Sequence, residues 1–126
     1  MVGEKTQNKL SVNEIQIKME IILSGGGSGE KTKELDELFA NIIDKSKPLL
    51  YIPIAINKTK HPYPECLNWL KKTFDKFGVY LYEMWIEEDL FKSEMITPEK
   101  FGGIYIGGGN TFYLLKMLKK SSFWKF

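Results

Sequence analysis

One nearly unbroken apolar run, Pro48–Ile56, constrains the fold of this chain more than any other segment. Its sequence is Pro-Leu-Leu-Tyr-Ile-Pro-Ile-Ala-Ile, without a charged residue. A strand with one face in water alternates apolar and polar residues, whereas a strand covered by helices on both faces of a parallel sheet is apolar throughout. The run therefore predicts a buried strand of a parallel sheet. Because Pro53 cannot donate a ladder hydrogen bond, we expect the strand to bulge or end near it.

Strand-like and helix-like segments alternate along the rest of the chain. Further strands are expected at Ile17–Ser24, Val79–Trp85 and Gly103–Ile106, and helices at Glu30–Lys45, from Pro64 to a stop at Gly78, and from Thr111 onward. Segment 87–101 is ambiguous between a turn and a short helix. This β-α-β-α-β-(turn or α)-β-α order predicts an α/β fold, a doubly wound parallel sheet with flanking helices.

Apolar residues at helical spacing indicate which helix faces should be buried. In the first helix they are Leu35, Leu38, Phe39, Ile42 and Ile43, and in the last helix Phe112, Leu115 and Leu118. A further aromatic set is expected to supply core, namely Phe74, Phe77, Tyr80, Tyr82 and Trp85.

Composition narrows the class of protein. The 126 residues suffice for one domain, and 43% apolar with 27% charged residues is ordinary for a globular protein. A net charge of +2 indicates no nucleic-acid partner, and no apolar run reaches the roughly 18 residues that span a bilayer. The single cysteine and a polar N-terminal segment without a secretion signal favour the cytoplasm. Residues 1–18 are expected to be an extension or tail, and 19–126 the domain.

Two glycine-rich turns follow two of the expected strands. Gly25-Gly26-Gly27 comes after the first strand, and Gly107-Gly108-Gly109 after the last. Ligands of open α/β sheets bind outside the carboxyl ends of strands, where the strand order reverses. If the order is 3-2-1-4, both turns flank one crevice. The alternative is that the glycines only permit tight strand-to-helix turns.

The first of these turns resembles a nucleotide site without matching one. In Ser-Gly-Gly-Gly-Ser-Gly-Glu-Lys-Thr, Glu30 separates Gly29 from Lys31, whereas a Walker A loop needs glycine and lysine adjacent. An acidic residue there would also direct negative charge toward phosphate. Nucleotide binding at Gly25–Gly29 is therefore the less favoured alternative.

The second turn, Gly107-Gly108-Gly109-Asn110-Thr111, suits an anion better. Successive glycines let backbone amides approach a ligand, and a following helix N-terminus adds further N–H groups. The Asn110 side chain can both donate and accept hydrogen bonds. Asn110 can also be explained as the N-cap of the last helix, and the two roles are compatible.

His61 and Cys66 are weaker candidates for chemistry. His61 lies in a lysine-rich loop and is expected on the surface, while Cys66 lies near Leu67 and Leu70 and is expected in the core. Neither sits at the end of an expected strand, which disfavours a Cys/His catalytic pair. They also lack the partners of a metal site. No metal and no cofactor are expected.

The run Ile104–Leu115 resembles the Gly-Gly-Gly-Asn-Thr/Gln segment of the peptidase E and cyanophycinase-type serine peptidases. The opening strand with Gly25-Gly26-Gly27, the Tyr51–Ala55 strand and the Phe74–Gly78 helix end agree in order, so the resemblance covers about Met19 to Lys120. It implies a glutamine-amidotransferase-like, flavodoxin-like three-layer α/β fold and a serine nucleophile on a strand-to-helix elbow. Known members cleave peptides with N-terminal aspartate or β-linked aspartyl polymers.

Site roles follow from this resemblance. Gly107, Gly108 and Gly109 would supply oxyanion-hole amides, and the substrate, a small acidic peptide or anion, would contact Asn110, Thr111, Gly25, Gly26 and Gly27. The family's nucleophile elbow, Gly-x-Ser-Ala-Gly-Ala, belongs to the next strand, and this chain ends at Phe126 before it. We therefore expect a domain truncated after its fourth strand and helix, without catalytic residues and inactive alone.

Truncation would change the edge of the sheet, and the turn also allows an alternative function. Strand Gly103–Ile106 would become an exposed edge, which favours a homo-oligomer. The alternative to a peptidase is a non-catalytic α/β module that binds an anionic small molecule at the Gly107–Asn110 turn.

Overall fold

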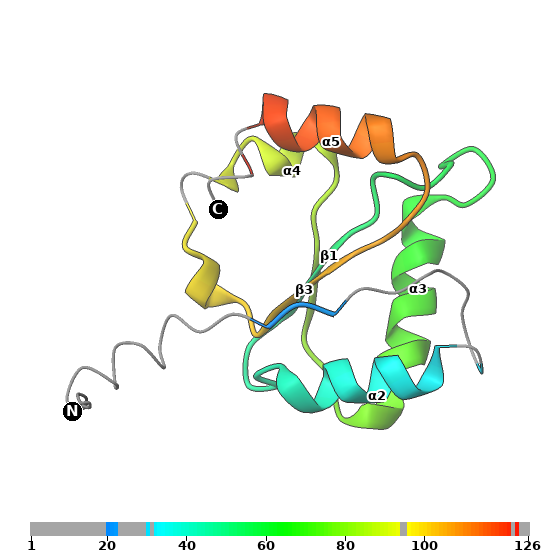
Figure 1. Cartoon of the computed structure of the whole chain (residues 1–126), viewed down its shortest axis with the longest axis vertical. Helices are drawn as coiled ribbons and strands as arrows, with labels where there is room; N and C mark the ends of the chain where they lie inside the picture. The colour runs from blue at the N-terminus through cyan, green and yellow to red at the C-terminus, as the bar shows by residue number, and fades with distance from the viewer. Residues whose placement is uncertain (1–19, 23–29, 31, 94–95, 122, 124–126) are drawn as a thin grey trace, which may run out of the picture.

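The computed structural model describes residues 20–22, 30, 32–93, 96–121 and 123 (Figure 1). Its strands are β1 (Leu49–Ile52), β2 (Tyr82–Met84) and β3 (Gly103–Ile106). Its α-helices are α2 (Lys33–Ile42), α3 (Tyr63–Phe74), α4 (Glu87–Leu90) and α5 (Thr111–Lys120), with 3₁₀ turns at Asp75–Phe77 and Pro98–Lys100. The expected strand at 103–106 and the start of the last helix at Thr111 are confirmed.

The described strands form one parallel sheet in the order β2-β1-β3. Leu49 is in register with Tyr82 on one side and with Gly103 on the other. The expected order 3-2-1-4, in which the strands are numbered along the chain from Ile17–Ser24, is therefore wrong. It places the first expected strand between the second and the fourth, which are β1 and β3 here, and these two pair directly. Of the expected strand Ile17–Ser24, only residues 20–22 are described, and they have no regular secondary structure.

Helices cover both faces of the sheet. In Figure 1, α2 and α3 lie on one side of the strands and α4 and α5 on the other. Strand β1 is buried along its whole length, with Leu49 and Tyr51 in the core beside α2 and α3. Leu50 and Ile52 belong to the opposite core, beside α4 and α5. This confirms a parallel sheet buried on both faces, in a three-layer α/β fold, and β1 ends directly before Pro53 as expected.

Tyr105 of β3 forms the centre of an aromatic cluster under α2 and α3. Its ring lies 5.7 Å from Phe74, 5.8 Å from Tyr51 and 6.0 Å from Phe39, all edge to face. Such pairs contribute about 0.5–1.5 kcal/mol each beyond the burial of their area. The cluster fixes β3, and with it the turn that follows, against the rest of the domain.

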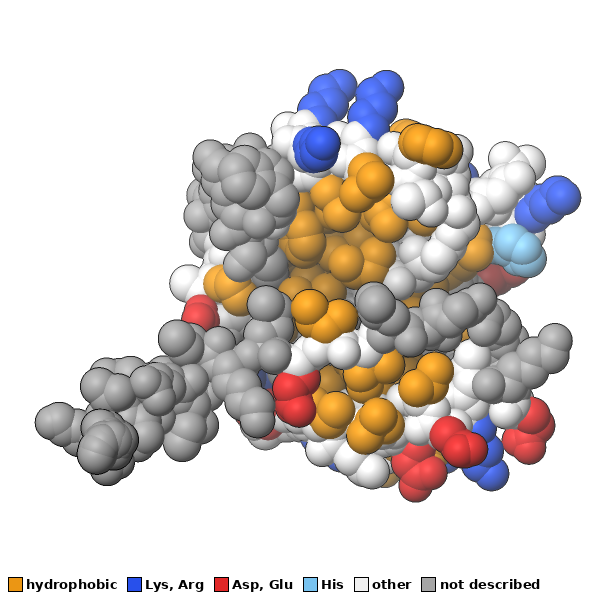
Figure 2. Space-filling view, viewed as in Figure 1, with side chains coloured by type: hydrophobic (Ala, Val, Ile, Leu, Met, Phe, Trp, Pro, Cys, Tyr) orange, Lys and Arg blue, Asp and Glu red, His pale blue; other side chains and the backbone are white. Residues whose placement is uncertain are grey.

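Several apolar residues expected in the core are exposed. On α2 these are Leu38 (48% exposed) and Ile42 (39%), on α5 Phe112 (88%) and Leu115 (49%), and before β2 Tyr80 (75%). Of the expected residues, Phe39 on α2, Ile43 directly after it and Leu118 on α5 do pack against the cores, and α5 adds Leu114 and Met117. The described sheet extends no further than β3, so no described strand lies beneath the outer sides of α2 and α5. Figure 2 shows the resulting apolar surface between α5 and α2.

No helix within the described ranges is long and apolar enough to cross a membrane.

Candidate ligand-binding site at the carboxyl ends of the strands

The glycine turn after β3 is held firmly against the segment after β1. The backbone N–H of Gly107 donates to the carbonyl oxygen of Ile52 (N···O 3.0 Å), and that of Asn110 to Ala55 (2.8 Å). Gly109 has φ +143° in the left-handed region, where a side chain is strained. A Cβ on Gly109 would also collide with Ala55. Glycine is therefore required at position 109 by the backbone geometry.

Two amides of this turn remain available to a ligand. The N–H of Gly107 is not available, because it donates to the carbonyl of Ile52 and continues the ladder between β1 and β3. In the part of the chain that the structure describes, no carbonyl accepts a hydrogen bond from Gly108 or Gly109. Gly108 is exposed, and a Cβ there would meet no atom within 4 Å. Of the three expected oxyanion-hole amides, Gly108 and Gly109 are thus the ones free to donate.

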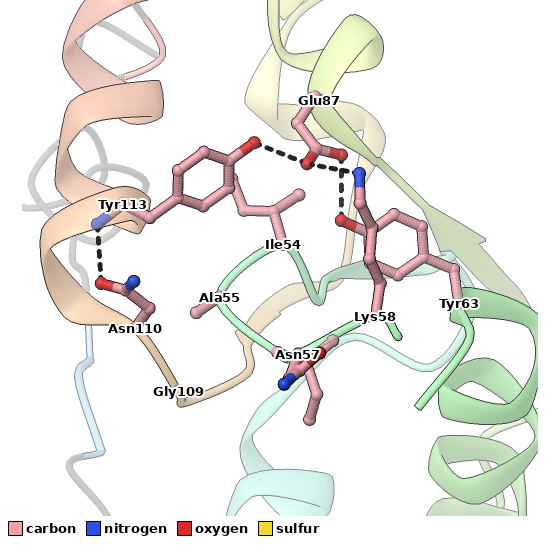
Figure 3. A pocket seen from close by; sticks show the side chains of 10 residues that line it. Ile54, Ala55, Asn57, Lys58, Tyr63, Glu87, Gly109, Asn110 and Tyr113 are labelled. Atoms are coloured by element: carbon pink, nitrogen blue, oxygen red, sulfur yellow. Dashed lines mark hydrogen bonds and ion pairs between the residues drawn. The ribbon is translucent and has the colours of Figure 1, made fainter. Parts of the chain in front are cut away.

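Asn110 caps helix α5. Its Oδ1 accepts a hydrogen bond from the backbone N–H of Tyr113 (3.0 Å), which satisfies one of the unpaired donors of the first turn. The side-chain nitrogen points away from that bond in Figure 3. Asn110 therefore fills the structural role, and its amide group is still free to donate to a ligand. Thr111 begins α5 and is exposed.

A pocket of about 480 Å³ opens beside this turn, which is within the range of small-molecule sites. Its lining combines the turn (Gly109, Asn110), the loop after β1 (Ile54, Ala55, Ile56, Asn57, Lys58), and the side chains of Tyr63, Glu87 and Tyr113 (Figure 3). These residues follow the carboxyl ends of β1, β2 and β3 or begin the helices beside them. That is the edge at which open α/β sheets bind ligands.

Glu87 is the central polar residue of the pocket. Its Oε1 accepts from the hydroxyl of Tyr63 (2.9 Å) and its Oε2 from the hydroxyl of Tyr113 (2.7 Å). The ammonium of Lys58 lies 3.6 Å from Oε2. The Glu87 side chain is 17% exposed, against 64% for Lys58. A fixed carboxylate thus faces a pocket that is also lined by a movable cation.

The hydrogen bonds keep this carboxylate ionised. Burial raises the pKa of Glu87, but hydrogen bonds from Tyr113, from its own backbone and from Tyr63, together with Lys58, outweigh burial, so the pKa lies below its ordinary value. Burial and the hydrogen bond to Glu87 raise the pKa of Tyr63, and a separate hydrogen bond to Glu87, with burial, raises the pKa of Tyr113. Both phenols therefore remain hydrogen-bond donors at neutral pH.

The end of β2 places Glu87. The N–H of Trp85 donates to the carbonyl of Tyr51 (2.9 Å), and the indole packs edge to face on Phe101 at 5.5 Å. The next N–H, of Ile86, donates to the Asp89 carboxylate (3.0 Å) and so begins α4. Sequence reasoning did not single out Glu87. The available signal was its position, an acidic residue two positions after the end of the expected strand Val79–Trp85.

The same turn borders a second hollow of about 960 Å³ on the side of α2 and α3. His61, Cys66 and Gly107–Gly109 all contribute to its lining. His61 is exposed and Cys66 buried, as expected. Burial, with Glu65 nearby, raises the pKa of the Cys66 thiol, so the reactive thiolate is disfavoured. A Cys/His nucleophile gains no support from this proximity.

The remaining site expectations concern the first turn and metals. Gly25, Gly26 and Gly27 lie outside the described residues. Across the described residues, no group of three or more His, Cys, Asp or Glu side chains could hold a metal ion.

Comparison with known proteins identifies the family. A model of peptidase family S51 matches residues 21–125. The match covers most of the chain, so this protein belongs to peptidase family S51. It agrees with the resemblance carried by Ile104–Leu115 and supports a peptidase-like function in general. Searches among curated proteins and among solved structures found no significant match.

Proposed function

We propose that this chain is a serine-type peptidase-like protein whose described residues form the substrate-binding part of a hydrolase site for small acidic peptides. The observation that carries the proposal is the free pair of amides at Gly108 and Gly109, next to Asn110, at the carboxyl ends of the strands. Gly109 and Asn110 line the pocket, and Gly108 follows on the side of the second hollow. Family S51 membership supports the peptidase class.

The turn has the chemistry of an oxyanion or carboxylate site. Backbone amides that are fixed before the ligand arrives stabilise developing negative charge without reorganisation. The N-terminus of the ten-residue helix α5 adds its partial positive charge at the same place. Lys58 supplies a full positive charge for an acidic side chain.

None of the described serines supplies a nucleophile to this pocket. The hydroxyl of Ser46 donates to Asp44, that of Ser121 donates to the Leu118 carbonyl, and Ser93 is buried. None of the three lines the pocket. An oxyanion hole without an attacking group gives little turnover. We therefore propose that the chain by itself binds acidic peptides and does not hydrolyse them.

The second candidate is a module that binds an anionic small molecule without any role in hydrolysis. This candidate is favoured because none of the described serines lines the pocket. A nucleotide at Gly25–Gly29 is the weakest candidate, because Glu30 interrupts the phosphate-binding pattern. For all three we propose a cytoplasmic location.

Calorimetric titration of the full chain separates these functions. We expect aspartylalanine to bind, alanylalanine to bind much more weakly, and ATP not to bind. Chromatography of the titrated sample should show intact dipeptide. Tight binding of ATP, or equal binding of the two dipeptides, would contradict the proposal. Release of free aspartate would contradict the claim that the chain alone is inactive.

A further inference from the structure

The charges in the pocket do not suit a simple anion. Glu87 is ionised and fixed, and it lines the same pocket as the Gly109 backbone and Lys58. A phosphate or free carboxylate would meet that negative charge as well as the positive groups. A ligand with an ammonium close to a carboxylate would satisfy both. An N-terminal acidic residue of a peptide has this arrangement.

Glu87 has unused capacity to accept hydrogen bonds. An ionised carboxylate offers about four lone-pair sites. Tyr63 uses one on Oε1 and Tyr113 one on Oε2. Lys58 at 3.6 Å is too distant for a good hydrogen bond to Oε2. The backbone N–H of Glu87 itself uses a third site, so one lone pair of the carboxylate is available to a ligand.

The two tyrosines and the lysine differ in how firmly they are held. Tyr63 begins α3 and Tyr113 lies in the first turn of α5, so both hydroxyls come from helices that pack on the sheet. Lys58 belongs to the loop after β1, and its side chain is 64% exposed. When a ligand ammonium approaches Glu87, Lys58 can move away, because its ammonium is solvated and lies 3.6 Å from Oε2, too far for a good hydrogen bond.

We propose that Glu87 determines specificity by receiving the free α-ammonium of a peptide N-terminus, while Lys58 turns to the carboxylate of the acidic side chain. This inference rests on the proposed function, since it assigns the orientation of an acidic peptide in that same pocket. Tyr63 and Tyr113 are positioning residues, because they hold the carboxylate and do not themselves need to touch the ligand.

The consequence is discrimination between free and blocked peptides. An N-acetyl group replaces the ammonium by an amide without charge and leaves Glu87 without its cation. Hydrogen bonds between charged groups are strong enough that the blocked peptide should bind at least about tenfold more weakly. Acetylation also adds bulk, so the variant Glu87→Gln must show whether charge or size is responsible.

The experiment titrates aspartylalanine and N-acetyl-aspartylalanine into the wild-type chain, Glu87→Gln, Lys58→Gln and the neighbouring exposed control Glu88→Gln. We expect about tenfold or greater preference for the free peptide in the wild type and in Glu88→Gln. Glu87→Gln should bind the two peptides alike. Lys58→Gln should weaken both peptides and retain the preference. Circular dichroism melts establish that each variant is folded.

The possible outcomes distinguish failure of this inference from failure of the proposed function. Equal binding of both peptides by the wild type overturns this inference while the proposed function stands, and this comparison needs no variant. A preference that persists in folded Glu87→Gln overturns the assignment to Glu87. If neither peptide binds the wild type, the proposed function itself fails and the inference with it.

Discussion

The carbonyl oxygen of Ala55 lies so close to Gly109 that a Cβ on this glycine would approach it to 2.2 Å. This contact joins the segment after β1 to the turn after β3. It is reinforced by the hydrogen bond from the Asn110 N–H to the same carbonyl, 2.8 Å long. The two segments that carry most of the candidate site are thus held as one unit, and the position of the free amides depends on it.

Replacement of Gly109 by alanine should therefore disrupt the turn. The side chain would be strained at φ +143° and would collide with Ala55. Strained backbone of this kind costs about 1–3 kcal/mol, before the collision is added. Gly108→Ala is the matched control, because its Cβ meets no atom within 4 Å, and it should change stability by less than about 0.5 kcal/mol. Urea denaturation measures the stability of both variants. Equal unfolding midpoints for the two variants would show that position 109 does not require glycine.

Asn110 allows the cap and the ligand contact to be separated. Asn110→Ala removes the acceptor for the Tyr113 N–H and should cost about 1 kcal/mol of stability. Asn110→Asp keeps a good cap and suits the helix dipole, but it places a negative charge on the pocket rim. We expect Asn110→Asp to be as stable as the wild type and to lose aspartylalanine binding in calorimetry. Asn110→Ser, a neutral cap, should lose less affinity.

The sequence predicted those features of the site that depend on local signals. Strand Gly103–Ile106 and the helix start at Thr111 were correctly placed, because an apolar run, successive glycines and an asparagine cap are adjacent along the chain. Glu87 was missed because its partners Tyr63 and Tyr113 are 24 and 26 residues away in the sequence. Only the folded sheet brings them together.

Helical periodicity likewise has a physical limit. It indicates that a helix has an apolar side but not how much of that side the sheet covers. Leu38 and Phe112 have helical spacing with buried neighbours, yet they remain exposed, since the described sheet extends no further than β3. The order of the strands has a different limit, and the expected order 3-2-1-4 was wrong. Hydrophobic alternation sets the register within a pair of strands, but strand runs of similar composition give no signal for which two of them pair.

Two phenylalanines test whether a buried aromatic residue and an exposed one at helical spacing differ in their contribution to stability. Phe74 is fully buried and packs on Phe39 and Tyr105 at 5.7 Å each, so Phe74→Ala should cost about 3–5 kcal/mol. Phe112 is 88% exposed, and Phe112→Ala should stay within about 0.5 kcal/mol of the wild type. Thermal and urea denaturation compare the two. A large loss for Phe112→Ala would show that its ring is buried in solution.

Acid should destabilise the fold partly through Glu87. Its pKa in the folded chain is below the ordinary value of 4.5, so the folded state binds a proton less readily than the unfolded state. The stabilisation is present above the unfolded pKa and is lost as the pH falls through the folded one. Denaturation at pH 7 and at roughly pH 3 should show a smaller loss for Glu87→Gln than for the wild type. Identical losses would show that the tyrosines do not lower this pKa.

Exposed apolar residues on β3 and α5 predict that the chain associates with itself. Ile104, Ile106 and Leu115 are 37%, 43% and 49% exposed, and among the described strands β3 pairs only with β1. An apolar surface beside an open sheet edge is a common site of association. We expect sedimentation to show a concentration-dependent dimer of the wild type and a weaker one for Leu115→Lys. Tyr80→Lys, which removes an exposed aromatic residue next to the opposite edge strand β2, should leave the dimer unchanged. A monomer at all concentrations would refute this prediction, and equal weakening by both substitutions would place the contact elsewhere.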